Sequence, residues 1–150
     1  MQSFTLTLGL FNHSKQTALS IDVESCNLSD WLESQHDEMT LECVEIDAQA
    51  FSSINCFDDL IALVDWLDSQ DFIDLDQVSD FLSLFSLSDL DSYDDYHTGC
   101  NDFSEYAQEI ADDCLLHSVP DDIKCYFDYA AFERDLSFDY TIGRYVWRNV

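Results

Sequence analysis

The first fifty residues alternate between apolar and polar positions, which is the pattern of half-buried β-strands. Segment 4–10 has an apolar side chain at every second residue, and segments 17–23 and 40–46 predict two further strands. Between the second and third strands, residues 27–35 predict a short helix that is capped by its first asparagine, Asn27, or its first serine.

From residue 56 to residue 85, apolar residues recur at intervals of three and four, which is the spacing of helices. Two helices are predicted, over 56–70 and 74–85, followed by a short third helix over 86–93. We expect the acidic residues on the outer faces of these helices. Trp66 and Phe72 are expected in the core, where they would anchor the acidic stretch between them.

Aspartates follow one another at steps of three from Asp65 through Asp68 and Asp71 to Asp74. On a helix of 3.6 residues per turn, each such step drifts by about 60°. The first three carboxylates are therefore expected to spiral across a helix surface. The next helix is expected to begin near Asp74.

The last third of the chain predicts a mixture of helices and strands. An Asp-x-x-Glu capping box at Asp102 predicts a helix that runs to about His117. Pro120 predicts the start of a short helix, and segment 128–136 predicts another. Residues 140–150 are expected to form closing strands.

These changes of pattern predict an α+β chain of three small domains. The first is a β-rich domain over residues 1–52, the second a helical acidic domain over 53–97, and the third a mixed domain over 98–150. No apolar run approaches the ~20 residues that span a membrane, and the N-terminus lacks the basic start of a signal peptide. We therefore expect a cytoplasmic protein.

The most unusual feature of the composition is its charge. The chain has 32 acidic residues against five Lys or Arg, giving a net charge of −27, and no Lys or Arg lies between Lys15 and Lys124. A small domain needs a net charge of only about 2–8 to stay soluble. A field of this sign excludes nucleic acid and anionic membranes as direct partners. The partners expected are cationic.

The six cysteines contain no C-x-x-C pair. In a cytoplasmic protein they are expected to be reduced thiols, mostly buried as small apolar residues.

One spacing is compatible with zinc: His97 and Cys100, then Cys114 and His117. The alternative is that Cys114 lies on an amphipathic helix face and His117 lies at the end of that helix. Spacing does not show that four ligands converge, so we expect no zinc site.

Residues 94–105 resemble a calcium-binding loop, with acids at loop positions 1, 9 and 12 and Gly99 at position 6. Position 3 is Tyr96 and position 8 is Asn101, where a short oxygen ligand and an apolar residue are expected. In so acidic a chain, partial matches arise by accident.

The sequence contains little that indicates an enzyme. The chain has three glycines and no Gly-rich phosphate loop, and no Ser or Cys lies in a recognisable nucleophile context. We therefore expect a non-enzymatic protein without a cofactor.

The acids themselves suggest imitation of DNA. Duplex DNA carries one negative charge per ~1.7 Å of axis, so a net −27 equals the charge of roughly 46 Å of duplex. A fixed acidic surface of this kind would enter the basic groove of a DNA-binding enzyme and block it.

Residues 118–136, SVPDDIKCYFDYAAFERDL, resemble the ArdA-type antirestriction proteins, which carry a Y-x-D-Y-x-A-x-x-R-D-L block after a proline and a short acidic helix. The matching positions are Tyr126, Asp128, Tyr129, Ala131, Arg134, Asp135 and Leu136. Segments 102–113 and 53–69 resemble the family's preceding helix and central helical segment. The first fifty residues match more weakly, and the family's Gly-x-Trp feature is absent there.

The resemblance implies an elongated DNA mimic that inhibits type I restriction–modification enzymes by occupying the DNA groove of the methyltransferase core. It also implies a homodimer joined through the C-terminal domains. The alternatives are a mimic of DNA aimed at another machine, such as a CRISPR effector or a nucleoid or transcription protein, and a metal-binding protein.

The carboxylates expected to stand in for phosphates lie in the second and third predicted domains. They are Asp58, Asp59, Asp65, Asp68, Asp71, Asp74, Asp76, Asp80, Asp89, Asp91, Asp94, Asp95, Asp102, Glu105, Glu109, Asp112, Asp113, Asp121 and Asp122. The residues expected at the dimer interface are Tyr126, Phe127, Tyr129 and Phe132.

Overall fold

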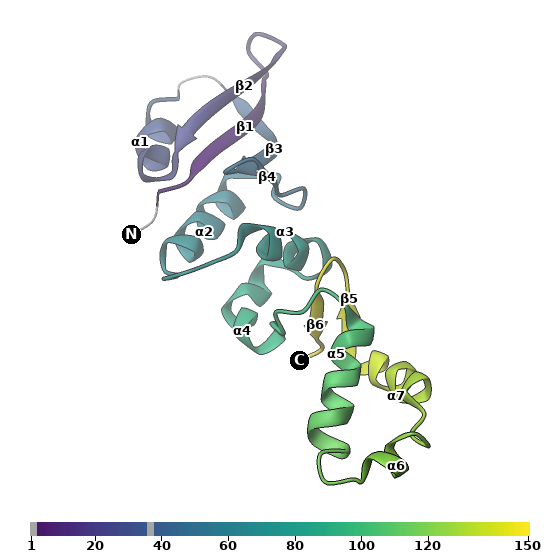
Figure 1. Cartoon of the computed structure of the whole chain (residues 1–150). Coiled ribbons are helices and arrows are strands. Elements are labelled where there is room, and N and C mark those ends of the chain that lie inside the picture. Colours follow the sequence, from purple (N-terminus) through teal and green to yellow (C-terminus); the bar gives the residue numbers. More distant parts are fainter. Residues whose placement is uncertain (1–2, 36–37) are drawn as a thin grey trace. The chain divides into compact units, whose positions relative to one another are not determined.

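The chain contains both helices and strands, which confirms the α+β class (Figure 1). The structure is a computed structural model that describes residues 3–35 and 38–150. The chain folds as two compact units, Met1–Leu90 and Asp91–Val150. The division into three domains, with boundaries after residues 52 and 97, stays a prediction.

The first unit opens with an antiparallel sheet in the order β2-β1-β3-β4 (Figure 1). Its strands are β1 (Thr5–Asn12), β2 (Thr17–Glu24), β3 (Met39–Ile46) and β4 (Gln49–Ala50). The three strands predicted from alternation are confirmed. The fourth has two residues, which is too short for an alternating pattern to show it.

The register of the sheet explains why alternation predicted it. Leu8 of β1 lies opposite Ile21 of β2 and Val44 of β3, so these side chains share the face that is directed to the core. Leu6, Leu8 and Leu10 are buried on this face. The opposite face carries polar side chains, and there the hydroxyl of Thr7 donates a 2.9 Å hydrogen bond to Asp22.

An irregularity in the pairing of β1 and β3 depends on a glycine. The register shifts between Gly9 and Leu10, which is a β-bulge, and Gly9 lies opposite Cys43. A Cβ atom at position 9 would overlap the Sγ atom of Cys43. The close approach of the two strands therefore requires a residue without a side chain here.

After β2, the 3-10 turn η1 (Ser25–Asn27) leads directly into the helix α1 (Leu28–Glu33). The predicted helix is confirmed, but the predicted cap is wrong. Asn27 makes no side-chain capping bond, and the first serine lies inside the helix. The preceding turn already uses the first helical donor, because the N–H of Leu28 bonds the carbonyl of Ser25.

Two helices complete the core of the first unit: α2 (Phe57–Asp68) and α3 (Leu75–Leu84). Both were predicted, and their periodic apolar residues are buried. Those residues are Leu60, Leu63, Val64 and Leu67 on α2, and Val78, Phe81 and Leu82 on α3. The helix predicted over 86–93 is instead the 3-10 helix η2 (Leu87–Ser92), followed by the single turn α4 (Tyr93–Tyr96).

Trp66 and Phe72 were both expected in the core, and for Phe72 this expectation is wrong. Trp66 is half-buried on α2, whereas Phe72 is 89% exposed. Phe72 lies in the loop between α2 and α3, where no helical face directs it toward the core.

The expectation that the cysteines are mostly buried is also wrong. All six are free, five are exposed, and Cys100 is half-buried. Local roles explain two of them: Cys43 lies on the outer face of the sheet, and Cys56 precedes α2, where its sulfur accepts from the N–H of Asp59.

The second unit begins with α4 and continues with α5 (Phe103–Ile110), which runs into a π-helical segment, η3 (Ala111–Leu115). The helix predicted from Asp102 is confirmed as far as Leu115. Its end is wider than a regular α-helix because the N–H of Leu116 bonds the carbonyl of Ala111.

The rest of the second unit follows the predicted order. The helices are α6 (Asp121–Lys124) and α7 (Tyr129–Leu136), and a 3-10 turn, η4 (Ser137–Asp139), leads to the hairpin of β5 (Tyr140–Ile142) and β6 (Val146–Arg148). Trp147 is fully buried and lies 5.5 Å from the ring of Tyr93 and 5.8 Å from that of His97. Within the described ranges, no helix is long and apolar enough to cross a membrane.

Candidate functional site: the acidic surface

The carboxylates of α2 differ in how far they reach solvent. Asp58 and Asp65 are exposed, whereas Asp59 and Asp68 are half-buried. The helix ends at Asp68, so it carries only the first two of the three aspartates expected in the spiral, and Asp71 lies in the following loop.

The loop between α2 and α3 presents two exposed carboxylates, Asp71 and Asp74. As predicted, the next helix begins at this point. Asp74 is the N-cap of α3, and its Oδ1 accepts a 3.0 Å hydrogen bond from the N–H of Asp76. The carboxylate of Asp74 is thus both part of the acidic surface and part of the helix cap.

Asp80 corrects the predicted surface. It is only 4% exposed, because it lies on the inner side of α3 beside the buried Phe81 and Val78. We therefore leave Asp80 out of the acidic surface.

Asp89 is half-buried and has a local structural role. Its Oδ2 accepts from the N–H and the hydroxyl of Ser86, at 2.9 and 2.8 Å. In this segment the aspartate is thus the acceptor and the serine the donor.

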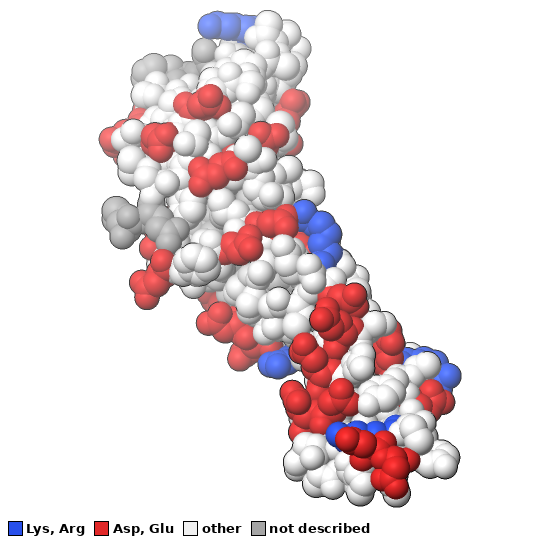
Figure 2. Space-filling model, in the orientation of Figure 1, with Lys and Arg blue, Asp and Glu red and all other residues white. Residues whose placement is uncertain are grey.

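In the second unit, exposed carboxylates line α4 and α5. Asp94 and Asp95 are exposed on α4. Asp102, Glu105 and Glu109 are exposed and spaced by three and four residues, so they share one face of α5. Figure 2 shows acidic side chains gathered over the segment that Figure 1 labels α5.

The first of these acids also holds its helix in place. Oδ1 of Asp102 accepts a 3.1 Å hydrogen bond from the N–H of Glu105, which confirms the first half of the predicted capping box.

Asp112 differs from its neighbour Asp113. Asp113 is exposed, whereas Oδ1 of Asp112 accepts a 2.6 Å hydrogen bond from the phenol of Tyr129. This bond raises the pKa of Tyr129 above its ordinary value of 10.0. Asp112 therefore also joins α7 to the end of the helix that carries it.

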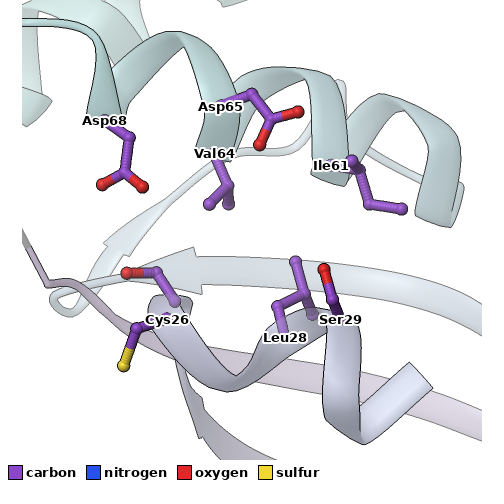
Figure 3. A pocket seen from close by; sticks show the side chains of 8 residues that line it. Cys26, Leu28, Ser29, Ile61, Val64, Asp65 and Asp68 are labelled. Carbon is purple, nitrogen blue, oxygen red and sulfur yellow. The ribbon is translucent and has the colours of Figure 1, made fainter. Parts of the chain in front are cut away.

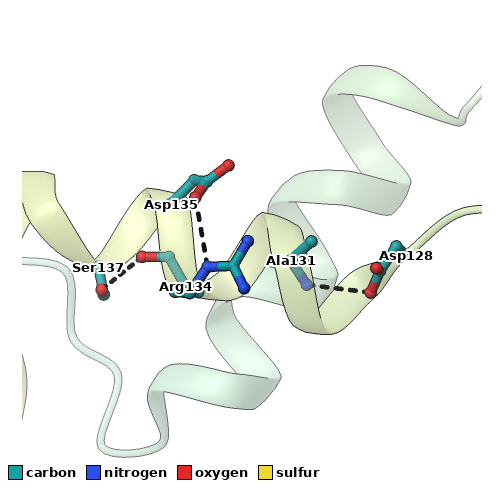
Figure 4. A network of polar contacts seen from close by, with 5 residues as sticks. All are labelled: Asp128, Ala131, Arg134, Asp135 and Ser137. Carbon is teal, nitrogen blue, oxygen red and sulfur yellow. Dashed lines mark hydrogen bonds and ion pairs between the residues drawn. The ribbon is translucent and has the colours of Figure 1, made fainter.

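Two basic residues of the second unit each lie beside one exposed acid. Nζ of Lys124 lies 3.6 Å from Asp121, and Nε of Arg134 lies 3.6 Å from Asp135 (Figure 4). Both acids are largely exposed, and exposed ion pairs contribute only about 0–1 kcal/mol.

Thirteen of the predicted carboxylates are exposed, four in the first unit and nine in the second, and we call this set of residues the acidic surface. They are Asp58, Asp65, Asp71, Asp74, Asp91, Asp94, Asp95, Asp102, Glu105, Glu109, Asp113, Asp121 and Asp122. The other predicted carboxylates except Asp80 are half-buried: Asp59, Asp68, Asp76, Asp89 and Asp112.

The block that carries the family resemblance has structural roles in α7. Oδ1 of Asp128 caps the helix by accepting a 3.0 Å bond from the N–H of Ala131, and the hydroxyl of Ser137 donates to the carbonyl of Arg134 at the other end (Figure 4). The spacing of Asp128 ahead of the helix would have been the signal for this cap, which sequence analysis did not use.

The aromatic residues expected at a dimer interface fall into two groups. Phe127 packs against Tyr129 and Phe132, with ring centroids 4.9 and 5.8 Å apart, and all three are half-buried. Tyr126 is 85% exposed, and the neighbouring Ile123 is also exposed. Tyr126 is therefore the aromatic side chain of this group that is available to a partner.

The candidate metal ligands do not gather. In the part of the chain that the structure describes, no three His, Cys, Asp or Glu side chains are arranged to hold a metal ion. His97 instead stacks on Tyr93 at a centroid distance of 5.4 Å, and Cys114 and His117 are exposed. In the calcium-like segment, Asp94 lies on α4 and Asp102 caps α5, so their carboxylates serve two separate helices.

These features define a small acidic α+β protein whose exposed surface suits a cationic partner. Residues 12–145 match the model of the antirestriction protein (ArdA) family, so the chain belongs to that family. Membership of this family implies a role in antirestriction. The match includes most of the first fifty residues, where the resemblance seen in the sequence was weaker. No curated protein and no solved structure matches the chain.

Proposed function

We propose that this protein inhibits type I restriction–modification enzymes by presenting its acidic surface to the DNA-binding groove of the methyltransferase core. Membership of the antirestriction family supports the class of target. The observation that carries the mechanism is the exposure of thirteen carboxylates in a chain that has 32 acids and five Lys or Arg.

The physical basis is the electrostatics of a groove that binds phosphates. Such a groove holds Lys and Arg at positions where DNA places one charge per ~1.7 Å of axis. Carboxylates held on helices would offer such a groove negative charges in place of phosphates. Binding releases the counterions of the protein, as binding of DNA does, so affinity should fall steeply as salt rises.

The direct test is competition with DNA. A fluorescein-labelled duplex bound to a purified type I methyltransferase is titrated with the protein at 50 mM and 200 mM salt, and fluorescence anisotropy is followed. We expect displacement of the duplex, with an inhibition constant at least tenfold weaker at the higher salt. Failure to displace DNA at 50 mM salt contradicts the proposal.

A matched pair of variants tests whether inhibition depends on the positions of the carboxylates or only on the net charge. The first variant neutralises Asp94, Asp95, Glu105 and Glu109 as Asn or Gln. The control neutralises four exposed acids of the first unit that lie outside the acidic surface, namely Asp30, Glu33, Glu42 and Glu45. Both variants lose four charges, so equal weakening of the two would show that only net charge matters.

We also propose that the protein forms a homodimer through the exposed side chains beside α6, with Tyr126 at the centre. Tyr126 and Ile123 form an apolar exposed pair, and tyrosine is enriched at protein interfaces. Two-fold symmetry would bring the same patch of both copies together.

A further inference from the structure

A groove in the first unit lies between two segments that are distant in sequence. One wall is η1 and the start of α1, with Cys26, Leu28 and Ser29, and the other is α2, with Val64, Asp65 and Asp68 (Figure 3). Its volume is about 210 Å³, far above the ~30 Å³ that one water occupies. The groove therefore has room for a side chain from another molecule.

The lining of the groove is apolar at one place and anionic at another. Leu28 and Val64 are buried and Ile61 is half-buried, and together they provide an aliphatic surface. Asp65 and Asp68 lie one helical turn apart on α2, and Figure 3 shows both side chains extending toward η1 and α1. A ligand that matches this surface has an aliphatic stem and a cationic end.

Asp68 has an atom without a partner. Its Oδ1 is buried, and none of the residues that the structure describes donates a hydrogen bond to it. A buried carboxylate oxygen that has lost its contacts with water is destabilising unless a donor replaces them. A cation that enters the groove would supply that donor.

Among the residues that the structure describes, the two walls of the groove supply no Lys or Arg. No Lys or Arg lies between Lys15 and Lys124, so neither wall carries one. Lys15 lies in the turn before β2, whereas the groove begins after β2 ends. A strand of eight residues spans about 26 Å at ~3.3 Å per residue, so Lys15 lies near the opposite end of the hairpin.

We propose that this groove receives a lysine or arginine side chain of the partner protein. The alkyl stem lies along Leu28, Ile61 and Val64, and the charged end binds the carboxylates of Asp68 and Asp65. This rests on the proposed function, and deepens it: the partner is held by a socket for one basic side chain as well as by a surface of many charges.

The socket is tested without any enzyme, by titrating the labelled protein with n-butylguanidinium and n-butylammonium and following methyl and amide NMR signals. n-Butanol is the uncharged control. We expect saturable shifts at Leu28, Ile61 and Val64 with both cations, and much weaker effects with n-butanol. Shifts that spread over the carboxylates of both units without saturation would show unspecific attraction of cations and overturn the proposal.

Two variants of equal charge identify the carboxylate that acts. Asp68→Asn is expected to weaken binding of the cations at least fivefold, whereas Asp58→Asn, on the same helix but outside the groove, is expected to leave it unchanged. Equal affinities for the two variants would contradict the role of Asp68.

A third variant, Ser29→Phe, fills the groove and keeps every charge. It is expected to abolish the methyl shifts and to weaken competition with DNA for the methyltransferase. If it abolishes the shifts but competes as well as the unchanged protein, the socket is not used by that partner, although DNA mimicry stands. If the unchanged protein binds the cations but never displaces DNA, the proposed function fails and the socket does not.

Discussion

The phenol of Tyr129 donates a 2.6 Å hydrogen bond to Oδ1 of Asp112, and this bond joins the start of α7 to the π-helical end of α5. Because the bond uses the proton of the phenol, it raises the pKa of Tyr129 above 10.0. Its stabilising effect is fully present below pH 10 and is lost as pH rises through the higher pKa of the folded state.

Removing the hydroxyl of Tyr129 should therefore destabilise the second unit at neutral pH. We expect Tyr129→Phe to lower the free energy of unfolding at pH 7, measured by urea denaturation. The difference from the unchanged protein should vanish above the pKa of Tyr129. Tyr126→Phe is the control, because Tyr126 is exposed; an equal loss in both variants would contradict the assigned bond.

The close approach of Gly9 to Cys43 predicts that the effect of Gly9→Ala on stability depends on the residue at position 43. Gly9→Ala should destabilise the protein by about 1 kcal/mol, because the new Cβ overlaps Sγ of Cys43. In the Cys43→Ala background the new Cβ would lie 3.7 Å from the Cβ at position 43, an ordinary contact. There Gly9→Ala should be neutral or slightly stabilising.

Thermal unfolding of the four proteins of this cycle measures the coupling between positions 9 and 43. The same loss on Gly9→Ala in both backgrounds would mean that the sulfur is not the obstacle.

The six thiols should differ in reactivity. Burial, reinforced by the nearby charge of Glu109, raises the pKa of Cys100 above 9.0, while the other five cysteines are exposed. At pH 8 we expect five thiols to react promptly with Ellman's reagent and one to react slowly, because the thiolate is the reactive form. In Cys100→Ser the slow phase should be absent; its persistence would assign it to another thiol.

Replacing an exposed acid that caps a helix should lower the free energy of unfolding more than replacing an exposed acid that does not. Asp102→Ala removes the acceptor for the N–H of Glu105 and should cost about 1 kcal/mol of unfolding free energy. Asp113→Ala removes the same charge without a described cap bond and should cost little or stabilise, since it relieves repulsion. Chemical denaturation of both variants, with fits that share one m-value, makes the comparison.

The proposed dimer predicts a concentration-dependent mass. We expect sedimentation equilibrium to give a dimer for the unchanged protein and a monomer for Tyr126→Ser, because the exposed ring supplies the apolar contact. Phe72→Ser is the control, since Phe72 is equally exposed but lies in the first unit. If Phe72→Ser dissociates the dimer and Tyr126→Ser does not, the interface lies elsewhere.

The sequence predicted elements well where periodicity is set by burial. The alternation of Leu6 and Leu8 and the helical spacing of Leu60, Leu63 and Val64 arise because each of these residues is on the buried side of its element. The burial of Asp80 and the exposure of Phe72 could not be predicted in this way, because they depend on where α3 begins and which side of it packs.

The sequence predicted that the candidate site is an acidic surface, but it did not predict which contacts the individual aspartates make. Net charge shows that a surface is acidic, whichever way the side chains turn. That Asp89 accepts from Ser86, or that Asp68 lines a groove against α1, depends on backbone positions that the order of residues does not contain.

The aspartates that cap helices give the acidic surface a form of robustness to mutation. Asp74 and Asp102 are exposed, yet each also holds the first turn of a helix. A substitution that removes the acceptor, such as Asp→Ala, weakens the fold in every cell, including cells in which no target enzyme is present. The requirement to fold therefore restricts these two positions to capping side chains, of which aspartate is the one that also supplies a charge to the acidic surface.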